Sequence, residues 1–455
     1  MTNNYLQELA SLVHGTKFAD LPAATVEKAK LHLLDTLGAG IAGAGSDEAH
    51  KALSVVSSAS GRGPSQIWGR TEKLSPRDAG FLNGVSSHAY ELDDCGGCDH
   101  SGAVVVPAIL ALLPVLDAPL SGMELLLSMT MGYEVGRRVL EACGGYEAHN
   151  ALGWHSTGTC GAFGAAAGAG VLLGLDETKL VSSMGIACSF AGGTWAFIHD
   201  GSQAKKLHSG RAAEGGVMAA LLAAASFRGP TSVLQPDTWG SYISTFGQNK
   251  GAPPLLTAGF GERWRLDRCS VKPYATCRGT HSAIDAVEEM LARHSLSPAT
   301  IASIEARMSV FQAGMCGATS VETRAQAQMS LPYAVAAKLA FGRVFLAELE
   351  ELAFQSPEVS SWLERISVHV DPDMADDAEP EITLVTTFGE RFSLTVDEPL
   401  GSPRSPLPQQ RIVDKFSNLA ERRLAPDRVR QVVDYVLEID SRPDVRDLPM
   451  LLAQQ

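Results

Sequence analysis

The apolar residues of this chain repeat every three to four positions up to about residue 265, and every second position in several segments beyond it. Val26, Leu33 and Leu37, for example, fall on one stripe of a helix that we expect to end before Gly38. The helical period recurs over 122–140, 158–173, 177–191 and 211–227. These repeats predict a helical domain over residues 1–266.

Beyond residue 270 the alternating pattern is typical of strands that bury one face. It occurs in four runs, at 304–310, 366–370, 382–384 and 392–396. Gly389 lies between the last two runs, which predicts an antiparallel hairpin. Two further helices, over about 281–294 and 332–339, interrupt the strands. We therefore expect a smaller α+β domain over 267–400.

Residues 401–455 return to the helical period after a Pro-rich piece, so we expect this tail to rejoin the helical domain. The predicted fold class is mainly α, with a large all-helical domain plus a smaller α+β lid domain. The chain has 44 glycines and several Ala-rich runs, which favour closely packed helices because small side chains let backbones approach.

Charge, hydropathy and cysteine content argue against several classes of protein. The formal charge of −14, without any run of Lys or Arg, argues against a nucleic-acid partner. The most apolar stretch, 103–116, is too short to cross a bilayer, so we expect a buried helix and no membrane partner. The eight cysteines lack a disulfide framework and the N-terminus lacks a signal peptide, which favours a reduced, cytoplasmic protein.

Three carboxylates lie within four positions, at Glu91, Asp93 and Asp94. Crowded carboxylates repel one another, so we expect at least one of their pKa values to be raised. Such a cluster suits an acid or base, a metal site, or a group that orients other residues. A solvated helix end is the alternative.

His100 follows this cluster on a glycine-rich loop that also carries Cys95 and Cys98. A C-x-x-C pair beside a histidine is compatible with zinc, but the second pair that strong zinc motifs supply is missing. We therefore expect no metal here and assign no role to the two cysteines.

Two further polar groups lie next to small-residue helices. His155 stands just ahead of a helix, whose dipole would disfavour the imidazolium and leave a neutral base. A structural capping histidine is the alternative. Lys205, His208 and Arg211 belong to a cationic segment over 200–211 that could bind an anion or could form a solvated basic turn.

The expected domain junction carries another group of candidates. Arg278 and His281 lie close to this junction, where clefts form preferentially, and His281 should start a helix. Ser330 is a predicted helix N-cap that would place Tyr333 in the first turns. Taken alone, Tyr333 is more often a core residue than a catalytic one.

Taken together, these segments resemble the MmgE/PrpD family, which includes 2-methylcitrate dehydratase, cis-aconitate decarboxylase and iminodisuccinate epimerase. The likeness covers nearly the whole chain. Its motifs are Leu34-Asp35-Thr36-Leu37-Gly38, Glu91-Leu92-Asp93-Asp94, Gly153-Trp154-His155-Ser156-Thr157-Gly158, Ala204-Lys205-Lys206-Leu207-His208-Ser209-Gly210, Lys272-Pro273-Tyr274, Gly279-Thr280-His281, Ser330-Leu331-Pro332-Tyr333 and Gly401-Ser402-Pro403. So many matches in order make the resemblance specific.

The resemblance implies a homodimeric enzyme that works without a metal or an organic cofactor. It places the catalytic groups at His100, His155, Lys205, His281 and Tyr333. We assign substrate binding to Glu91, Asp93, His208 and Arg278, of which Glu91 matches the acidic residue of the family motif.

The chain departs from the family pattern in one region. Glu91 stands where the family usually has aspartate, and the His-Pro pair of the family is His100-Ser101 here, on an altered loop. The long aromatic loop that we associate with 2-methylcitrate dehydratases is also missing after Asp94.

These residues predict a lyase or isomerase that acts on a small di- or tricarboxylate by proton transfer at a carbon α to a carboxylate. His155 or His281 would move the proton, while Lys205 neutralises negative charge. Tyr333 and His100 would donate hydrogen bonds or a proton. Dehydration, decarboxylation and epimerisation all remain open.

Two alternatives belong to other classes of protein. One is a metal-dependent hydrolase built on His100, Asp93 and Asp94. The other is a non-catalytic binding protein on the same fold, which would bind ligand without turnover.

Overall fold

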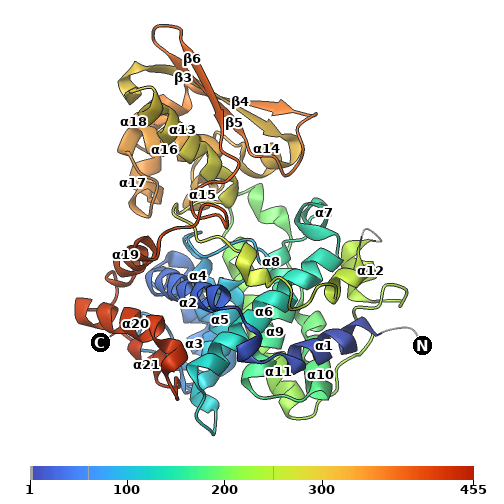
Figure 1. Ribbon diagram of the computed structural model, residues 1–455. Helices are drawn as coiled ribbons and strands as arrows, with labels where there is room; N and C mark the ends of the chain where they lie inside the picture. Colours follow the sequence, from blue (N-terminus) through green and yellow to red (C-terminus); the bar gives the residue numbers. More distant parts are fainter. Residues whose placement is uncertain (1–3, 60, 249–250, 455) are drawn as a thin grey trace.

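The computed structural model describes residues 4–59, 61–248 and 251–454 and consists of a helical body and a smaller part built around a sheet (Figure 1). The helices of the body are α1 (Tyr5–Gly15), α2 (Ala23–Gly43), α3 (Asp47–Ala59), α4 (Pro76–His88), α5 (Gly102–Leu112), α6 (Gly122–Ala142), α7 (Gly145–Ala151), α8 (Ser156–Thr159), α9 (Gly161–Leu172), α10 (Glu177–Ala187), α11 (Ala204–Ala224) and α12 (Tyr242–Gly247). The short strands β1 (Ser65–Gln66) and β2 (Lys73–Leu74) pair antiparallel beside them.

The smaller part comes next along the chain, and the tail then returns to the body. The smaller part contains α13 (His281–Arg293), β3 (Ile301–Ser309), α14 (Val310–Cys316), α15 (Arg324–Gln328), α16 (Leu331–Phe341), α17 (Glu351–Phe354), α18 (Pro357–Leu363), β4 (Ile366–Asp371), β5 (Glu381–Thr386) and β6 (Arg391–Thr395). The tail contains α19 (Gln409–Ala420), α20 (Pro426–Leu437) and α21 (Leu448–Leu451), of which α19 and α20 pack on α2.

The four-stranded sheet has the order β4-β3-β5-β6, with β3 parallel to β4 and antiparallel to β5. The hairpin predicted around Gly389 is confirmed as β5 and β6, and Gly389 has the positive φ of 84° that its turn requires. The mainly α fold with a smaller α+β part is therefore the predicted one.

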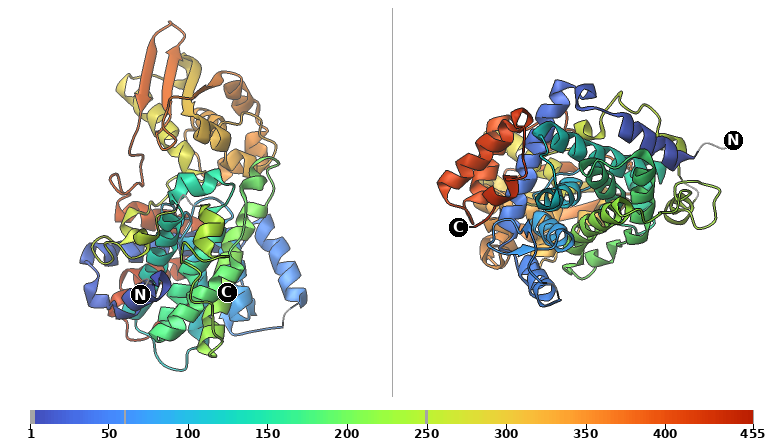
Figure 2. Two further views of the ribbon diagram at one scale, coloured as in Figure 1. Left: turned by 90° about the vertical axis from the view of Figure 1, so that its right-hand side faces the viewer. Right: turned by 90° about the horizontal axis from the view of Figure 1, so that it is seen from below.

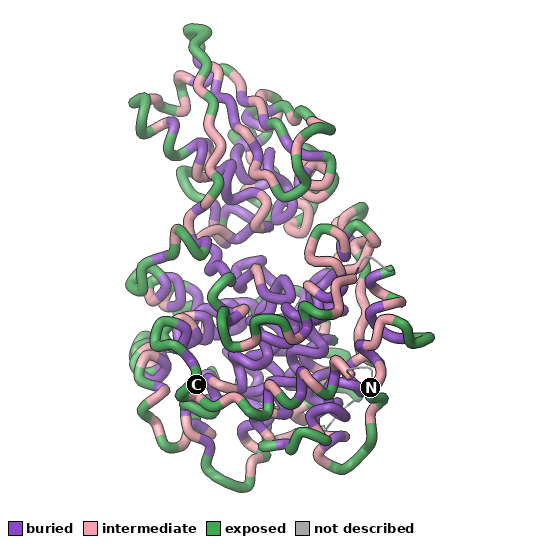
Figure 3. The backbone as a smooth tube through the Cα atoms, turned by 45° about the vertical axis from the view of Figure 1, so that its right-hand side comes forward, coloured by how far each residue is buried: buried purple, intermediate pink, exposed green. Residues whose placement is uncertain are grey.

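Two separate hydrophobic cores lie inside the two parts. The larger runs from Leu6 to Cys269 and is completed by α19 to α21, while the smaller consists mainly of residues between Ala275 and Leu384. Figure 3 shows buried segments inside each part and exposed segments around them. We propose the domain boundaries near residues 267 and 401 on this basis.

Close packing explains why α2 contains glycines. The sequence pattern predicted an end before Gly38, but the helix continues to Gly43. A Cβ on Gly43 would lie 1.8 Å from the backbone oxygen of Ser86 in α4. The glycines of α2 therefore allow close contact between helices and do not terminate α2, so the prediction was wrong.

Helix α11 begins earlier than predicted, at Ala204. Lys205, Lys206 and His208 therefore lie in its first turns and not in a loop between helices. Lys205 and Lys206 are buried, whereas Arg211 is exposed and pairs with Glu214. Only part of the predicted cationic segment can therefore serve an interior site.

Two other boundaries differ from the expected ones. The predicted helix 158–173 is interrupted at Cys160, between α8 and α9. The predicted strand 304–310 ends at Ser309, because the Ser309 side chain accepts the Gln312 N–H and so caps α14. Val310 is consequently 58% exposed.

Most of the apolar stretch 103–116 lies in α5, which is buried along its whole length, as predicted; the helix ends at Leu112, and a short 3-10 turn with an exposed Val115 follows. Within the described residues, no helix combines the length and the apolar character that a membrane span needs.

The two parts meet at backbone hydrogen bonds near the proposed boundaries. Cys95 and Ser270 exchange two hydrogen bonds, of 3.2 and 2.8 Å, and the Val271 N–H donates to the Gly401 carbonyl at 3.1 Å. Figure 2 shows the sheet of the smaller part beyond the end of the helical body. A cavity lies at this junction.

Candidate active site

The loop from Ala89 to Ser101 joins α4 to α5 and carries two strained residues. Glu91 has a φ of 55° and Asp99 a φ of 102°, both in the left-handed region that residues other than glycine rarely adopt. Such strain costs roughly 1–3 kcal/mol and persists where the surroundings fix the conformation, often at functional sites. Both side chains are buried and face cations or histidines.

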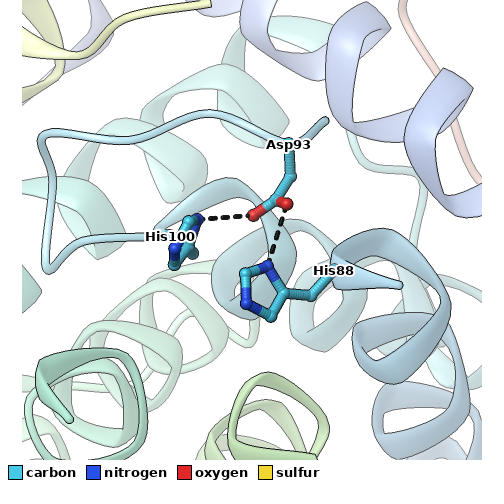
Figure 4. Close-up of side chains that lie close together, drawn as sticks. All are labelled: His88, Asp93 and His100. Carbon is cyan, nitrogen blue, oxygen red and sulfur yellow. Dashed lines mark hydrogen bonds and ion pairs between the residues drawn. The ribbon is translucent and has the colours of Figure 1, made fainter. Parts of the chain in front are cut away.

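Asp93 lies between His88, with which it makes a hydrogen bond, and His100, with which it forms a close ion pair (Figure 4). The Nδ1 atoms of His88 and His100 each lie 2.9 Å from a different oxygen of Asp93. Burial alone would raise the pKa of Asp93, but the two histidines hold it well below its usual range. Burial holds the pKa of His88 well below its usual range, so His88 is neutral and Asp93 is charged.

His100 is a histidine whose surroundings favour the protonated form. Burial alone would lower its pKa, but the carboxylates of Asp99 and Asp93 reverse that effect and the pKa is raised. Its Nε2 lies 3.5 Å from Asp99 Oδ2, on the side opposite Asp93. An imidazolium at this position can act as an acid near neutral pH.

His155 is neutral for a different reason. Burial lowers its pKa to about 4, although Asp99 acts in the opposite direction. The helix after it, α8, has only four residues, so burial replaces the predicted dipole as the cause. His155 Nδ1 lies 2.9 Å from His208 Nδ1, and its Nε2 lies 3.7 Å from Asp99 Oδ2.

Glu91 is surrounded by lysines. Its carboxylate lies 2.7 Å from Lys205 Nζ, 2.6 Å from Lys206 Nζ and 3.3 Å from Lys272 Nζ. Burial would raise the pKa of Glu91, but these cations hold it well below its usual range. The prediction of a raised pKa from crowded carboxylates fails for Glu91 and Asp93, because each carboxylate faces cations or histidines and not its acidic neighbours.

A cavity of about 450 Å³ lies between the two parts of the molecule. Asp99, His100 and Lys205 line it from the helical body, and Cys277 and Arg278 line it from the smaller part. The cavity therefore brings a protonated histidine and a buried ammonium group to one wall.

The structure brings some predicted residues to this cavity and leaves others behind its wall. His100, Lys205 and Arg278 are part of the described lining, and Arg278 also pairs with Glu379 at 2.7 Å. The other candidates from the helical body, Glu91, Asp93, His155 and His208, form a layer behind that lining and contact its residues or one another.

His281 and Tyr333 lie elsewhere in the smaller part. His281 begins α13, as predicted, and its Nε2 lies 3.3 Å from the Thr276 carbonyl. Tyr333 follows its predicted cap, Ser330, and its hydroxyl donates to the Glu348 carbonyl. Neither belongs to the described lining, so a role for either in catalysis stays a prediction.

Of the three residues of the metal-hydrolase alternative, Asp93 and His100 lie together, and with His88 they are close enough to hold a metal ion. The Asp94 side chain points elsewhere and accepts hydrogen bonds from Tyr133 and the Gly102 N–H, with His32 Nδ1 at 2.9 Å. This arrangement uses Asp94 to anchor the start of α5. The hydrolase alternative therefore loses one of its carboxylates.

The two thiols of the C-x-x-C pair are buried. Burial raises the pKa of Cys95 to about 12 and also raises that of Cys98, so neither is a reactive thiolate near neutral pH.

The sequence interpretation missed three residues that complete the site. Asp99 faces both His100 and His155, Lys272 pairs with Glu91, and His88 shares Asp93 with His100. Lys272 stands in a family motif, and an acidic residue directly before His100 was a usable signal for Asp99. The spacing of His88 and Asp93 alone carried no such signal.

The fold and the site define a two-part, mainly helical protein. Its candidate site contains two buried histidines, one with a raised and one with a lowered pKa, beside a lysine. The sequence model of the MmgE/PrpD N-terminal domain matches residues 7–253, and that of the MmgE/PrpD C-terminal domain matches residues 274–439. The chain belongs to the MmgE/PrpD family.

Curated relatives resemble the chain over nearly its whole length. A cis-aconitate decarboxylase of Aspergillus terreus is 29% identical over 95% of this chain and 92% of its own length. The human cis-aconitate decarboxylase is 28% identical over 99% of this chain and 95% of its own length. A cis-aconitate decarboxylase-like protein of Aspergillus oryzae is 28% identical over 99% and 97% of the two chains.

Proposed function

We propose that this protein is a lyase that removes carbon dioxide or water from a small polycarboxylate by proton transfer at a carbon α to a carboxylate. Membership of the MmgE/PrpD family and the cis-aconitate decarboxylase relatives support a lyase with a carboxylate substrate. The observation that carries the proposal is the pair His100 and His155, whose environments move their pKa values in opposite directions around one carboxylate, Asp99.

In this proposal His100 is the acid at the cavity wall. Its ring N–H groups face Asp93 and Asp99, and a proton from the imidazolium can be delivered to the carbanion-like centre that forms when carbon dioxide leaves, or to the hydroxyl group that leaves as water. Lys205, which lines the same cavity, neutralises a substrate carboxylate and the charge that develops on it.

His155 is the neutral proton acceptor of the proposal. Its Nε2 and that of His100 face the same oxygen, Asp99 Oδ2, which links the two rings. For Nε2 to accept a proton, His155 Nδ1 must donate to His208 Nδ1, which makes His208 a positioning residue for the required tautomer.

Two further parts of the proposal concern the oligomeric state of the protein and its location in the cell. We propose a cytoplasmic homodimer, on the family resemblance and the free cysteines. Sedimentation equilibrium of the purified protein tests the dimer, and a monomer would contradict it.

The reaction is tested by NMR of the purified protein in D2O with cis-aconitate, 2-methylcitrate and iminodisuccinate. We expect a decarboxylated product with deuterium at the newly protonated carbon, or a dehydrated product with exchange of the α proton of the substrate, from at least one of these acids. Binding of these acids without product or exchange would favour the binding-protein alternative. Activity that chelators remove would favour the metal hydrolase.

A further inference from the structure

Two cysteines from different segments of the smaller part lie side by side. Cys277 directly precedes the short turn 278–280, and Cys316 is the last residue of α14. A Cβ on Gly279 would lie 3.4 Å from Cys316 Sγ and 4.0 Å from Cys277 Sγ, so both sulfur atoms lie beside the same backbone position. The Cys316 thiol donates a hydrogen bond to the Cys277 sulfur. The fold therefore brings the two thiols into contact.

The two thiols differ in access. Cys277 is 8% exposed and lines the cavity that His100 and Lys205 also line. Cys316 is fully buried and does not belong to the described lining of that cavity. A small molecule that enters the cavity therefore meets the Cys277 sulfur first.

The charged groups around Cys277 favour its thiolate. The hydrogen bond from Cys316 lowers the pKa of Cys277, and the ammonium groups of Lys205 and Lys272 lower it further. Burial and Glu91 act in the opposite direction without reversing the effect. The thiolate, and not the thiol, is the nucleophilic form of cysteine. Cys277 is therefore poised to react with an electrophile in the cavity.

Cys277 is exceptional among the eight cysteines, all of which lie in the described part of the chain. The pKa of every other cysteine is raised, by burial in most and by the hydrogen bond to Cys277 in Cys316. A low-pKa cysteine that a small molecule can reach, next to a second thiol, is the usual arrangement of a redox-sensitive site. The C-x-x-C pair of Cys95 and Cys98 has the spacing of such a site but lacks the thiolate.

We propose that Cys277 and Cys316 are a redox-sensitive pair that a hydroperoxide converts to a disulfide. The Cys277 sulfur attacks the O–O bond of hydrogen peroxide and becomes a sulfenic acid, and the hydroxide that leaves takes up a proton to form water. The Cys316 sulfur then attacks the Cys277 sulfur, and the sulfenic hydroxyl leaves with the Cys316 proton as a second water. Two thiols are oxidised to one disulfide while one peroxide is reduced to two waters.

This site goes beyond the proposed lyase reaction, because its co-reactant is an oxidant and not a carboxylate. Arg278 and Met315, the chain neighbours of Cys277 and Cys316, line the same cavity, so the disulfide forms in the cavity wall. Oxidation and alkylation of the thiols are measured by mass and do not depend on turnover of a carboxylate.

The thiolate is tested by alkylation of the unmodified protein with iodoacetamide at pH 7, followed over time by peptide mass spectrometry. Cys188 is the internal control, because it is the one cysteine of the eight that is not buried and burial still raises its pKa. A thiol with an ordinary pKa is only a few per cent thiolate at this pH, so we expect Cys277 to react roughly 10-fold faster than Cys188. Faster reaction of Cys188, as exposure alone predicts, would contradict the thiolate.

The disulfide is tested by treatment of the unmodified protein with hydrogen peroxide, followed by peptide mapping without reduction. We expect a cross-linked peptide pair that contains Cys277 and Cys316, lighter by two hydrogens and separated again by dithiothreitol. No disulfide, or a disulfide that joins Cys95 to Cys98, would overturn the proposal.

Two matched variants separate the roles of the two cysteines. In Cys316→Ala the second thiol is missing, so peroxide should leave Cys277 as a sulfenic acid that dimedone traps. Cys98→Ala removes another buried thiol and should still form the disulfide between Cys277 and Cys316. Absence of the dimedone adduct from folded Cys316→Ala would show that peroxide does not attack Cys277. Mapping of the unmodified protein decides on the disulfide even where a variant does not fold.

Discussion

At the scale of single residues, Glu91 is the carboxylate that pairs with three buried lysines of the candidate site. It was assigned to substrate binding from the sequence, but it is fully buried and pairs with three lysines. The motif indicated that an acidic residue matters at this position. It could not indicate which cations face it, because those come from α11 and from the start of the smaller part.

Glu91→Gln should destabilise the protein strongly. Removal of one partner from a buried ion pair costs about 3–5 kcal/mol, because the remaining charges stay buried. The free energy of unfolding from urea denaturation measures the effect. Glu27→Gln is the control, since Glu27 pairs with Lys30 from a side chain that is 58% exposed and such pairs contribute ~0–1 kcal/mol. Equal losses in the two variants would contradict the buried-charge account.

The pH dependence of deuterium exchange should reflect the pKa values of His155 and His100. His155 must be neutral, so the rate rises with pH through about 4, where its pKa lies. His100 must be protonated, so the rate falls again at a pH above its ordinary value of 6.5. Asp93→Asn removes a carboxylate that raises the pKa of His100 and should move the alkaline limb to lower pH. An alkaline limb that stays in place would show that another group controls it.

At the scale of elements, periodicity predicted most of the fold and failed where packing overrides local preference. The β5–β6 hairpin was predictable because alternation and a turn glycine agree. The extension of α2 to Gly43 was not, since its cause is the approach of Ser86 from another helix. The early start of α11 was missed because its first turns bury lysines that resemble a solvated loop in sequence.

Gly401→Ala tests the junction between the two parts. Gly401 has a φ of 89°, and an added Cβ would lie 2.0 Å from the Val271 backbone oxygen. Gly342→Ala is the matched control, because its φ is 76° but nothing lies within 4 Å of the new Cβ. The control should lose the roughly 1–2 kcal/mol of left-handed strain, and Gly401→Ala should lose more. Similar unfolding free energies in the two variants would mean that the junction accommodates the added Cβ without loss of stability, which would contradict the prediction.

At the scale of the whole molecule, the candidate site depends on two parts that the chain joins at about residues 270 and 401. The family resemblance identified His100 and Lys205, and the position at the expected domain junction pointed to Arg278; all three line one cavity. Sequence reasoning could not predict that Asp99 would lie between two histidines. The cavity and this arrangement arise only when α4, α5, α11 and the smaller part come together.

Buried neutral histidines should make the folded protein sensitive to acid. His149 and His155 have pKa values lowered to about 4, and His208 to about 3, in each case mainly by burial. As the pH falls below 6.5, these histidines bind protons in the unfolded chain but not in the folded protein. The free energy of unfolding therefore decreases with falling pH until about pH 4. For His155 the full effect is roughly 3 kcal/mol. Urea denaturation at pH 7 and pH 5 measures the loss, and equal stability at both would contradict the neutral assignment.

The central claim is that His100 delivers a proton to substrate within a lysine-bearing cavity. The most direct measurement is the rate of deuterium incorporation at the α carbon of a turned-over polycarboxylate, compared between the unmodified protein and His100→Asn. His14→Asn, at an exposed residue of α1, is the control. We predict a loss of about 10²–10⁴-fold in His100→Asn and none in His14→Asn. Incorporation by folded His100→Asn at the rate of the unmodified protein would contradict it.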